Sequence, residues 1–158
     1  MVFLPVSPPP QKQAPVATVL GVRTKTSDCQ IQGPFPDKTC TPGDIIPTAS
    51  KDQICIPGYS KNVRNVPQEE KNQVYQEYGI LSHQKGEYEV DHLIPLELGG
   101  SNDISNLWPE AAAPIPGFHE KDTVENLLHD QVCSGNLTLQ QAQQEISNNW
   151  LQVYQSIK

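Results

Sequence analysis

The sequence predicts an α+β protein in which a two-stranded hairpin and the helix after it are embedded among further helices. A β-prone segment at residues 88–94 is followed by the turn signal Gly99-Gly100 and by a second short apolar segment. Helical spacing of apolar residues then covers residues 119–132 and 138–157. Nine of the 15 prolines fall before residue 48, which indicates an irregular N-terminal part rich in proline and glycine.

The chain of 158 residues has the length of one domain. Residues 1–27 are expected to be a flexible Pro-rich leader, since five prolines fall before residue 16, and residues 28–158 are expected to form a single domain. No apolar run approaches the ~20 residues that a membrane-spanning helix needs, which excludes an integral membrane protein. Met1–Val6 has no basic start and is interrupted by Pro5, so we do not expect it to be a secretory signal.

The first long helix is predicted over Gln68–Tyr78. Pro67 suits the first position of a helix, because it has no backbone N–H to leave unpaired, and Gly79 ends the pattern. The apolar stripe of this helix consists of Val74, Tyr75 and Tyr78.

The hairpin is predicted to begin with a strand at Tyr88–Ile94, where apolar and polar residues alternate weakly. Gly99-Gly100 turns the chain, and a second short strand is expected around Ile104–Leu107. Pro109–Gly117 is expected to be a loop of small residues before the next helix. The hairpin and that helix together are expected to span about residues 86–132.

Two helices are predicted at the C-terminal end. The first runs from about His119 to Val132 and ends before Gly135; its apolar face carries Val124, Leu127, Leu128 and Val132. The second, at about residues 138–157, opens on a capping box, Thr138-Leu139-Gln140-Gln141. Its apolar stripe is expected in the core and consists of Leu139, Ala142, Ile146, Trp150, Val153 and Ile157.

Charge is distributed unevenly along the chain. The net charge of −7 and the pI of about 4.9 argue against a protein that holds nucleic acid by a broad basic surface. Residues 87–130 contain ten carboxylates and a single lysine, Lys121. This composition fits a solvated acidic surface, and it equally fits a divalent-cation site, where a 2+ ion offsets crowded carboxylates.

The four cysteines are Cys29, Cys40, Cys55 and Cys133. They form no Cys-x-x-Cys pair and no Cys/His zinc spacing, and an even number in a loop-rich chain predicts one or two disulfides, with buried free thiols as the alternative. A link from Cys133 to Cys55 or to Cys40 is favoured over Cys40–Cys55, because it would anchor the end of the 119–132 helix to the irregular N-terminal half. Cys29 would then pair with the remaining cysteine.

The segment with the clearest chemistry runs from Asp91-His92 through Gly99-Gly100 to Asn106. Adjacent aspartate and histidine let one strand end offer a metal-binding carboxylate and an imidazole that titrates near neutrality. Asn106 is placed to clamp the hairpin through its side-chain amide. The helix that follows adds His119, Lys121, Asp122 and Glu125. A base, oxygen ligands and a cation in one pocket suit metal-assisted hydrolysis of a phosphodiester.

These motifs resemble those of the HNH endonuclease family, which has the ββα-metal (His-Me) finger. The resemblance rests on Asp91-His92, Pro95, Gly99-Gly100 and the string Asn106-Leu107-Trp108-Pro109. A bacterial subgroup with Lys-Asp-x-x-Glu in the helix is matched by Lys121-Asp122 and Glu125, and the similarity covers roughly residues 38–154. The common HNH form begins this helix with Cys-x-x-Cys-His, and both of those cysteines are absent from this sequence.

The resemblance implies a metal-dependent endonuclease that hydrolyses DNA with little sequence specificity, with RNA as the alternative substrate. It implies one divalent ion, Mg²⁺ or Mn²⁺, with Zn²⁺ or Ni²⁺ as alternatives. His92 would be the general base and Asn106 the hairpin clamp. The expected metal ligands are Asp91 with one or two of His119, Asp122 and Glu125. Three cations are expected to contact phosphates: Lys121 at the scissile bond, and Lys61 and Arg64 along the backbone.

We expect double-stranded DNA as the substrate, no contact with a membrane, and a monomeric chain. Whether an inhibitor protein binds the chain is left open. Disulfides favour a bacterial, secreted or extracytoplasmic location, with the cytoplasm as the alternative. Two other classes of function remain. One is a non-catalytic module that binds nucleic acid or protein on the same scaffold. The other is a disulfide-stapled extracellular interaction domain in which Asp91-His92 is structural.

Overall fold

The computed structural model describes residues 19–158; residues 1–18, most of the expected leader, lie outside the described residues. The helices are α1 (Lys51–Ile54), α2 (Tyr59–Val63), α3 (Gln68–Glu77), α4 (Phe118–Cys133) and α5 (Leu139–Ser156). The strands are β1 (Tyr88–His92) and β2 (Leu107–Ala111), and two 3-10 turns between them are η1 (Leu96–Leu98) and η2 (Ile104–Asn106). One antiparallel hairpin among five helices confirms the expected α+β class for the described part of the chain.

The hairpin pairs β1 with β2 in a register that sets Asp91 opposite Trp108. The expected strand at Ile104–Leu107 and the loop expected from Pro109 were wrong, because β2 begins only at Leu107 and includes Pro109. Asp103 explains the difference: its carboxylate accepts a hydrogen bond from the backbone N–H of Ser105 at 3.0 Å and closes η2. Both strands are edge strands, where a proline does not interrupt a larger sheet.

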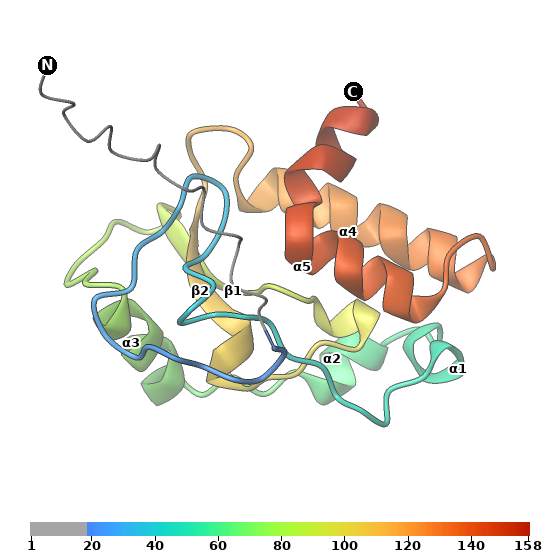
Figure 1. The fold of residues 1–158 in the computed structure, drawn as a ribbon, viewed down its shortest axis with the longest axis horizontal. Coiled ribbons are helices and arrows are strands. Elements are labelled where there is room, and N and C mark those ends of the chain that lie inside the picture. The colour runs from blue at the N-terminus through green and yellow to red at the C-terminus, as the bar shows by residue number, and fades with distance from the viewer. Residues whose placement is uncertain (1–18) are drawn as a thin grey trace, which may run out of the picture.

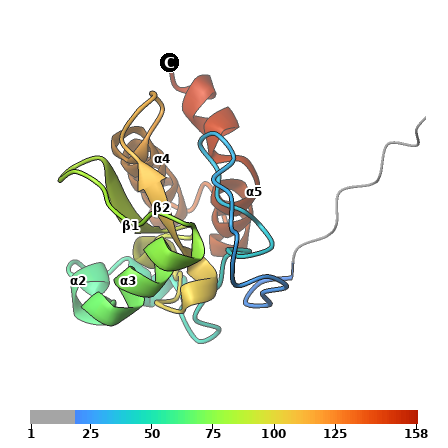
Figure 2. The same ribbon diagram turned by 90° about the vertical axis from the view of Figure 1, so that its left-hand side faces the viewer.

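Two hydrophobic cores lie on either side of the hairpin. The hairpin is flanked by α3 on one side and by the α4–α5 pair on the other (Figures 1 and 2). The core between α4, α5 and η1 contains Ile54, Ile94, Leu98, Val124, Leu128, Val132, Ala142, Ile146 and Trp150. The core on the α3 side contains Cys29, Cys40, Val74, Tyr78, Leu93, Leu107 and Trp108.

The helix boundaries follow the local signals closely. The capping box at the start of α5 is confirmed: Gln141 N–H donates to Thr138 Oγ1 at 3.1 Å, and Thr138 N–H donates to Gln141 Oε1 at 3.0 Å. Ala142, Ile146 and Trp150 of the α5 stripe are buried and Leu139 and Val153 are half-buried, but Ile157, expected in the core, is 42% exposed. Asn149 has non-helical backbone angles (φ −163°, ψ 71°), so the last turns of α5 no longer present the same face to the core.

Two disulfides, Cys29–Cys40 and Cys55–Cys133, are present, and the described residues contain no free cysteine. The expected link from Cys133 to the N-terminal half is confirmed, with Cys55 and not Cys40 as its partner. It joins the end of α1 to the last residue of α4 across 78 residues of sequence. The other disulfide closes a short loop within the irregular segment, 11 residues apart.

Some residues before the expected boundary at residue 28 contact the rest of the domain. Gly21 N–H donates to the Gly43 carbonyl at 2.8 Å, and Thr24 N–H donates to the Thr39 carbonyl at 3.0 Å. Arg23 pairs with the carboxylate of Glu77 at the end of α3. Residues 21–25 are therefore attached to the domain through several contacts. Across residues 19–158, no helix combines the length and the apolar character that crossing a membrane requires.

Candidate active site

One face of the hairpin carries several acidic residues beside Trp108 and is approached by Lys121 of α4. Residues that oppose each other on antiparallel strands point to the same side of the sheet. The pairs Glu89–Glu110 and Asp91–Trp108 therefore share a face, and Lys121 of α4 reaches it from above. This register concentrates three carboxyl groups around a single lysine.

Lys121 is the charged centre of this arrangement and is fully buried, with 0% of its side chain exposed. Its ammonium donates to Asp91 Oδ2 at 3.3 Å, to the carbonyl oxygen of His92 at 2.9 Å and to the carboxylate of Glu125. Burial by itself lowers the pKa of Lys121, but Asp91 and Glu125 outweigh this and raise it. The expected contact of Lys121 with a scissile phosphate does not fit this geometry, because all three N–H groups are used inside the protein.

Asp91 is ionised at neutral pH in this environment. Burial raises the pKa of its carboxyl, but the neighbouring ammonium of Lys121 outweighs that effect and holds the pKa below its ordinary value. Its Oδ1 atom accepts a hydrogen bond from the backbone N–H of His92 at 2.9 Å. The carboxylate is thus oriented from both sides.

His92 is buried, with 3% of its surface exposed, and its orientation is set by Asn102. The Asn102 amide nitrogen donates to the Val63 carbonyl at 2.7 Å, which leaves its Oδ1 atom facing His92 Nε2 at 3.1 Å. An amide oxygen only accepts, so the network assigns the hydrogen to Nε2 and the free lone pair to Nδ1. Burial lowers the pKa of His92. The side chain is therefore a neutral imidazole at pH 7, in the tautomer with Nδ1 free to accept a proton.

The Nδ1 atom of His92 is left without a hydrogen-bond partner among the described residues. Among residues 19–158, the only fully buried side-chain nitrogen or oxygen atoms without a partner are the two carboxyl oxygens of Glu110, so Nδ1 retains some solvent contact. This contact is small, because only 3% of His92 is exposed and His92 is not among the residues that line the cleft described below.

Asn106 holds the connection between the strands. Its Oδ1 atom accepts from the backbone N–H groups of Ile94 at 3.0 Å and Asp44 at 3.2 Å. Its amide nitrogen donates to the carbonyl oxygens of Ile94 at 2.9 Å and Ser101 at 2.8 Å. These four bonds use the full capacity of the amide. Asn106 therefore lies where a clamp was expected and has no group left for a substrate.

The remaining carboxyl groups exceed what Lys121 can neutralise. Burial, with a further contribution from Asp91, raises the pKa of Glu89 to about 7 and raises the pKa of Glu110 strongly. Burial also raises the pKa of Glu125 to about 8, although Lys121 opposes this. Raised carboxyl pKa values of this kind are what crowded carboxylates show when no further cation lies among them.

A polar cleft of about 610 Å³ lies beside these groups. Arg64, directly after α2, and Lys71 of α3 line it opposite the acidic residues, so both are placed to contact phosphates. Lys61 is exposed on α2 and does not line the cleft. The other lining residues are Gln68, Asn72, Tyr75, His83, Glu89, Val90, Asp91, Asp122 and Glu125.

Three of the four expected metal ligands, Asp91, Asp122 and Glu125, line this one cleft. His119 does not; it is exposed on α4 and its ring lies 4.5 Å from that of Phe118. The donors in the cleft are carboxylate oxygens; Glu110, whose two oxygens are buried without a partner, does not line this cleft. Oxygen ligands of this kind suit a hard divalent cation such as Mg²⁺ or Mn²⁺.

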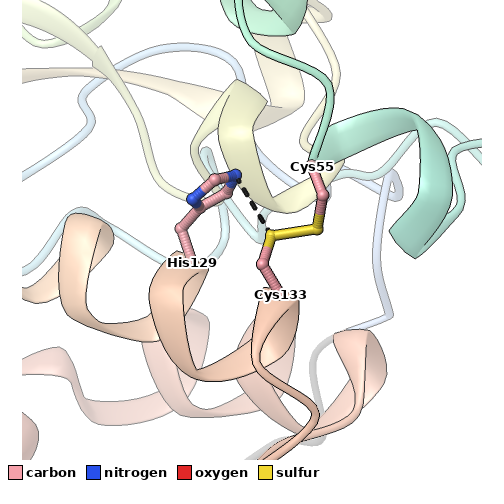
Figure 3. Close-up of side chains that lie close together, drawn as sticks. All are labelled: Cys55, His129 and Cys133. Carbon is pink, nitrogen blue, oxygen red and sulfur yellow. Dashed lines mark hydrogen bonds between the residues drawn. A yellow bond between two sulfur atoms is a disulfide. The ribbon is translucent and has the colours of Figure 1, made fainter.

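A second cluster of metal-binding residue types lies elsewhere, at Cys55, His129 and Cys133 (Figure 3). It is the only group of three within the described chain whose ligand atoms all lie within 4.8 Å of one another. Its two sulfurs are bonded to each other, and His129 Nε2 lies 3.7 Å from Cys133 Sγ and 2.9 Å from the carbonyl oxygen of Ile54. Because metals bind thiolates, the disulfide form does not offer this cluster as a metal site.

Four residues of the site were not singled out in the sequence: Glu89, Asn102, Glu110 and Lys71. Glu89 had a signal, since it lies two positions before Asp91 on the same strand face, and Glu110 directly follows the Asn-Leu-Trp-Pro string. Asn102 and Lys71 had no such signal, because their roles depend on segments distant in sequence.

Comparison of the chain with family models, curated proteins and solved structures finds no match.

Proposed function

We propose that the protein is a metal-dependent endonuclease of the HNH type that hydrolyses phosphodiester bonds of DNA with little sequence specificity. The observation that carries the proposal is the state of His92: a buried, neutral imidazole, fixed by Asn102 in the tautomer that leaves Nδ1 free. It follows directly on the ionised Asp91, beside a cleft lined by Arg64 and Lys71. A general base needs this combination of protonation state and orientation.

The local architecture supports the same proposal. A two-stranded hairpin, with the Asp91-His92 pair at the end of its first strand and a helix over its polar face, is the arrangement that a ββα-metal finger requires. The α4 residues that face the hairpin belong to the Lys-Asp-x-x-Glu pattern, through Lys121 and Glu125. The two disulfides fit an extracytoplasmic location, where such bonds persist.

Each side chain then has a distinct part in the reaction. His92 Nδ1 accepts the proton of the attacking water, while Asn102 keeps the ring in the correct tautomer. Arg64 and Lys71 hold the phosphates of the substrate in the cleft. Lys121 is a positioning residue, because it orients Asp91 and the His92 carbonyl from a buried site. A divalent cation held by Asp91 and its carboxylate neighbours would stabilise negative charge on the phosphate.

A second candidate is a non-catalytic binding module on the same scaffold. The observation in its favour is that the ammonium of Lys121 already lies between Asp91 and Glu125 and offsets part of their charge without a metal ion. The two candidates differ in whether phosphodiester bonds are broken.

The deciding experiment is cleavage of plasmid DNA and of RNA by the purified protein with Mg²⁺, Mn²⁺, Zn²⁺, Ni²⁺ or EDTA. We expect cleavage with Mg²⁺ or Mn²⁺, none with EDTA, and a rate at least about 10²-fold lower for His92→Ala, the usual scale for losing a general base. His119→Ala, an exposed histidine outside the cleft, is the matched control and should cleave like wild type. A folded His92→Ala protein that cleaves near the wild-type rate contradicts the assignment, and binding without cleavage by wild type favours the second candidate.

A further inference from the structure

The carboxyl group of Glu110 is buried without any hydrogen-bond donor. The residue is 2% exposed, and neither Oε1 nor Oε2 has a partner. A buried polar group without a partner is costly, so native structures rarely leave one unexplained. Within residues 19–158 no other side-chain nitrogen or oxygen is in this state.

The neighbours of Glu110 explain why no donor is available. In the hairpin it opposes Glu89 and lies diagonally from Asp91, on the face that α4 covers. Its carboxyl meets that of Asp91 within hydrogen-bonding reach. Two carboxylates are both acceptors, so this contact is favourable only when a proton or a cation lies between them. Lys121 does not supply the donor, because its bonds go to Asp91, the His92 carbonyl and Glu125.

One divalent ion would offset the net charge of this cluster when all its carboxyl groups are ionised. Asp91, Glu110 and Glu125 carry three negative charges when ionised, and Lys121 carries one positive charge. A 2+ ion offsets the other two, which no nearby side chain does. The available donors are carboxylate oxygens, which bind Mg²⁺ and Mn²⁺ in preference to softer metals.

We propose that Glu110 binds the divalent cation together with Asp91, instead of His119, one of the three α4 residues considered as further ligands in the sequence. Its unpaired oxygens face Asp91 from the neighbouring strand, whereas His119 is exposed on the outer side of α4. The inference rests on the proposed metal-dependent function, but it concerns binding of the ion and is tested without cleavage.

The test is calorimetric titration of Mg²⁺ and of Mn²⁺ into the metal-free protein and its variants. Glu110→Gln keeps the shape of the side chain but replaces a ligand oxygen by an amide donor, which would satisfy Asp91 as well as a protonated carboxyl does. We expect wild type to bind one ion, and Glu110→Gln and Asp91→Asn each to bind at least about tenfold more weakly, the scale known for lost metal-site partners. Glu145→Gln, at an exposed position on α5, is the matched control and should bind like wild type.

Thermal unfolding in EDTA checks that each variant is folded. If Glu110→Gln does not fold, the titration is made with Glu110→Asp instead. Drawing the carboxylate back by one methylene should also weaken ion binding at least about tenfold. Wild-type affinity in a folded Glu110→Gln or Glu110→Asp protein, with weakened binding in Asp91→Asn, overturns the inference and leaves the proposed function standing. Absence of any ion on wild type also overturns it. Failure of the general-base assignment is detected separately, by the cleavage assay.

Discussion

Removing the buried charge of Lys121 should destabilise this fold more than any other single change at the site. Lys121→Met keeps an unbranched side chain of similar length but deletes the contacts to Asp91, the His92 carbonyl and Glu125. Two carboxyl groups then remain buried beside Glu110 with no cation near them. Each must either stay charged in a poorly solvated site or take up a proton.

The cost follows from the easier of these two routes. Protonating Asp91 at pH 7, about three pH units above its ordinary pKa of 3.8, costs about 4 kcal/mol at roughly 1.4 kcal/mol per pH unit. Glu125 adds little, because burial already raises its pKa to about 8. An expected loss of about 4 kcal/mol in unfolding free energy agrees with the roughly 3–5 kcal/mol for breaking a buried ion pair from one side. This is a large share of the roughly 5–15 kcal/mol that stabilises an ordinary domain.

Urea denaturation of wild type and Lys121→Met at pH 5 and pH 8, in EDTA, measures this loss. The loss should be smaller at pH 5, because the orphaned carboxyl groups accept protons more easily there. Lys61→Met, at an exposed position on α2, is the matched control and should change the unfolding free energy by less than about 0.5 kcal/mol. A loss below about 1 kcal/mol at pH 8, or a larger loss at pH 5 than at pH 8, would refute the reasoning.

Two further outcomes are expected. Asn106→Ala should lower the unfolding free energy by at least about 3 kcal/mol in urea denaturation, because it leaves the buried N–H group of Ile94 and the C=O group of Ser101 unpaired. Asn148→Ala, at an exposed position, is the control, and an equally small effect in both variants would contradict the role of Asn106 as a clamp. Burial and the charge of Asp91 raise the pKa of Glu89 from 4.5 to about 7, so the folded state favours the protonated form. The resulting stabilisation of the folded state is complete below pH 4.5 and is lost as the pH rises to about 7. In EDTA, stability should therefore fall across this range, and Glu89→Gln should show a shallower fall; an unchanged slope would contradict the assignment.

The local features of this protein could be predicted because they depend on neighbouring residues. The capping box at Thr138 satisfies backbone groups within one turn, and Gly79 ends α3 by its own conformational freedom, with φ +67°. The Asp91-His92 pair was visible for the same reason, since adjacency in sequence places both groups at one strand end. The second strand was misplaced because a side chain, Asp103, closed a turn where apolar residues suggested β structure.

The sequence by itself predicted the α+β class and the three long helices, because hydrophobic periodicity and capping act over a few residues, but it did not predict the short helices α1 and α2. It also singled out His92 as the candidate base, through the adjacent Asp91-His92 pair. Only the tertiary structure decided what surrounds that base. Asn102 fixes the tautomer of His92 through Val63, 39 residues away, and Lys121 is fully buried, with its ammonium bonded to Asp91, Glu125 and the His92 carbonyl. Likewise Cys133 pairs with Cys55, although Cys40 was an equal alternative in the sequence. Such choices depend on which distant side chains share a low-dielectric interior, and no local pattern records that.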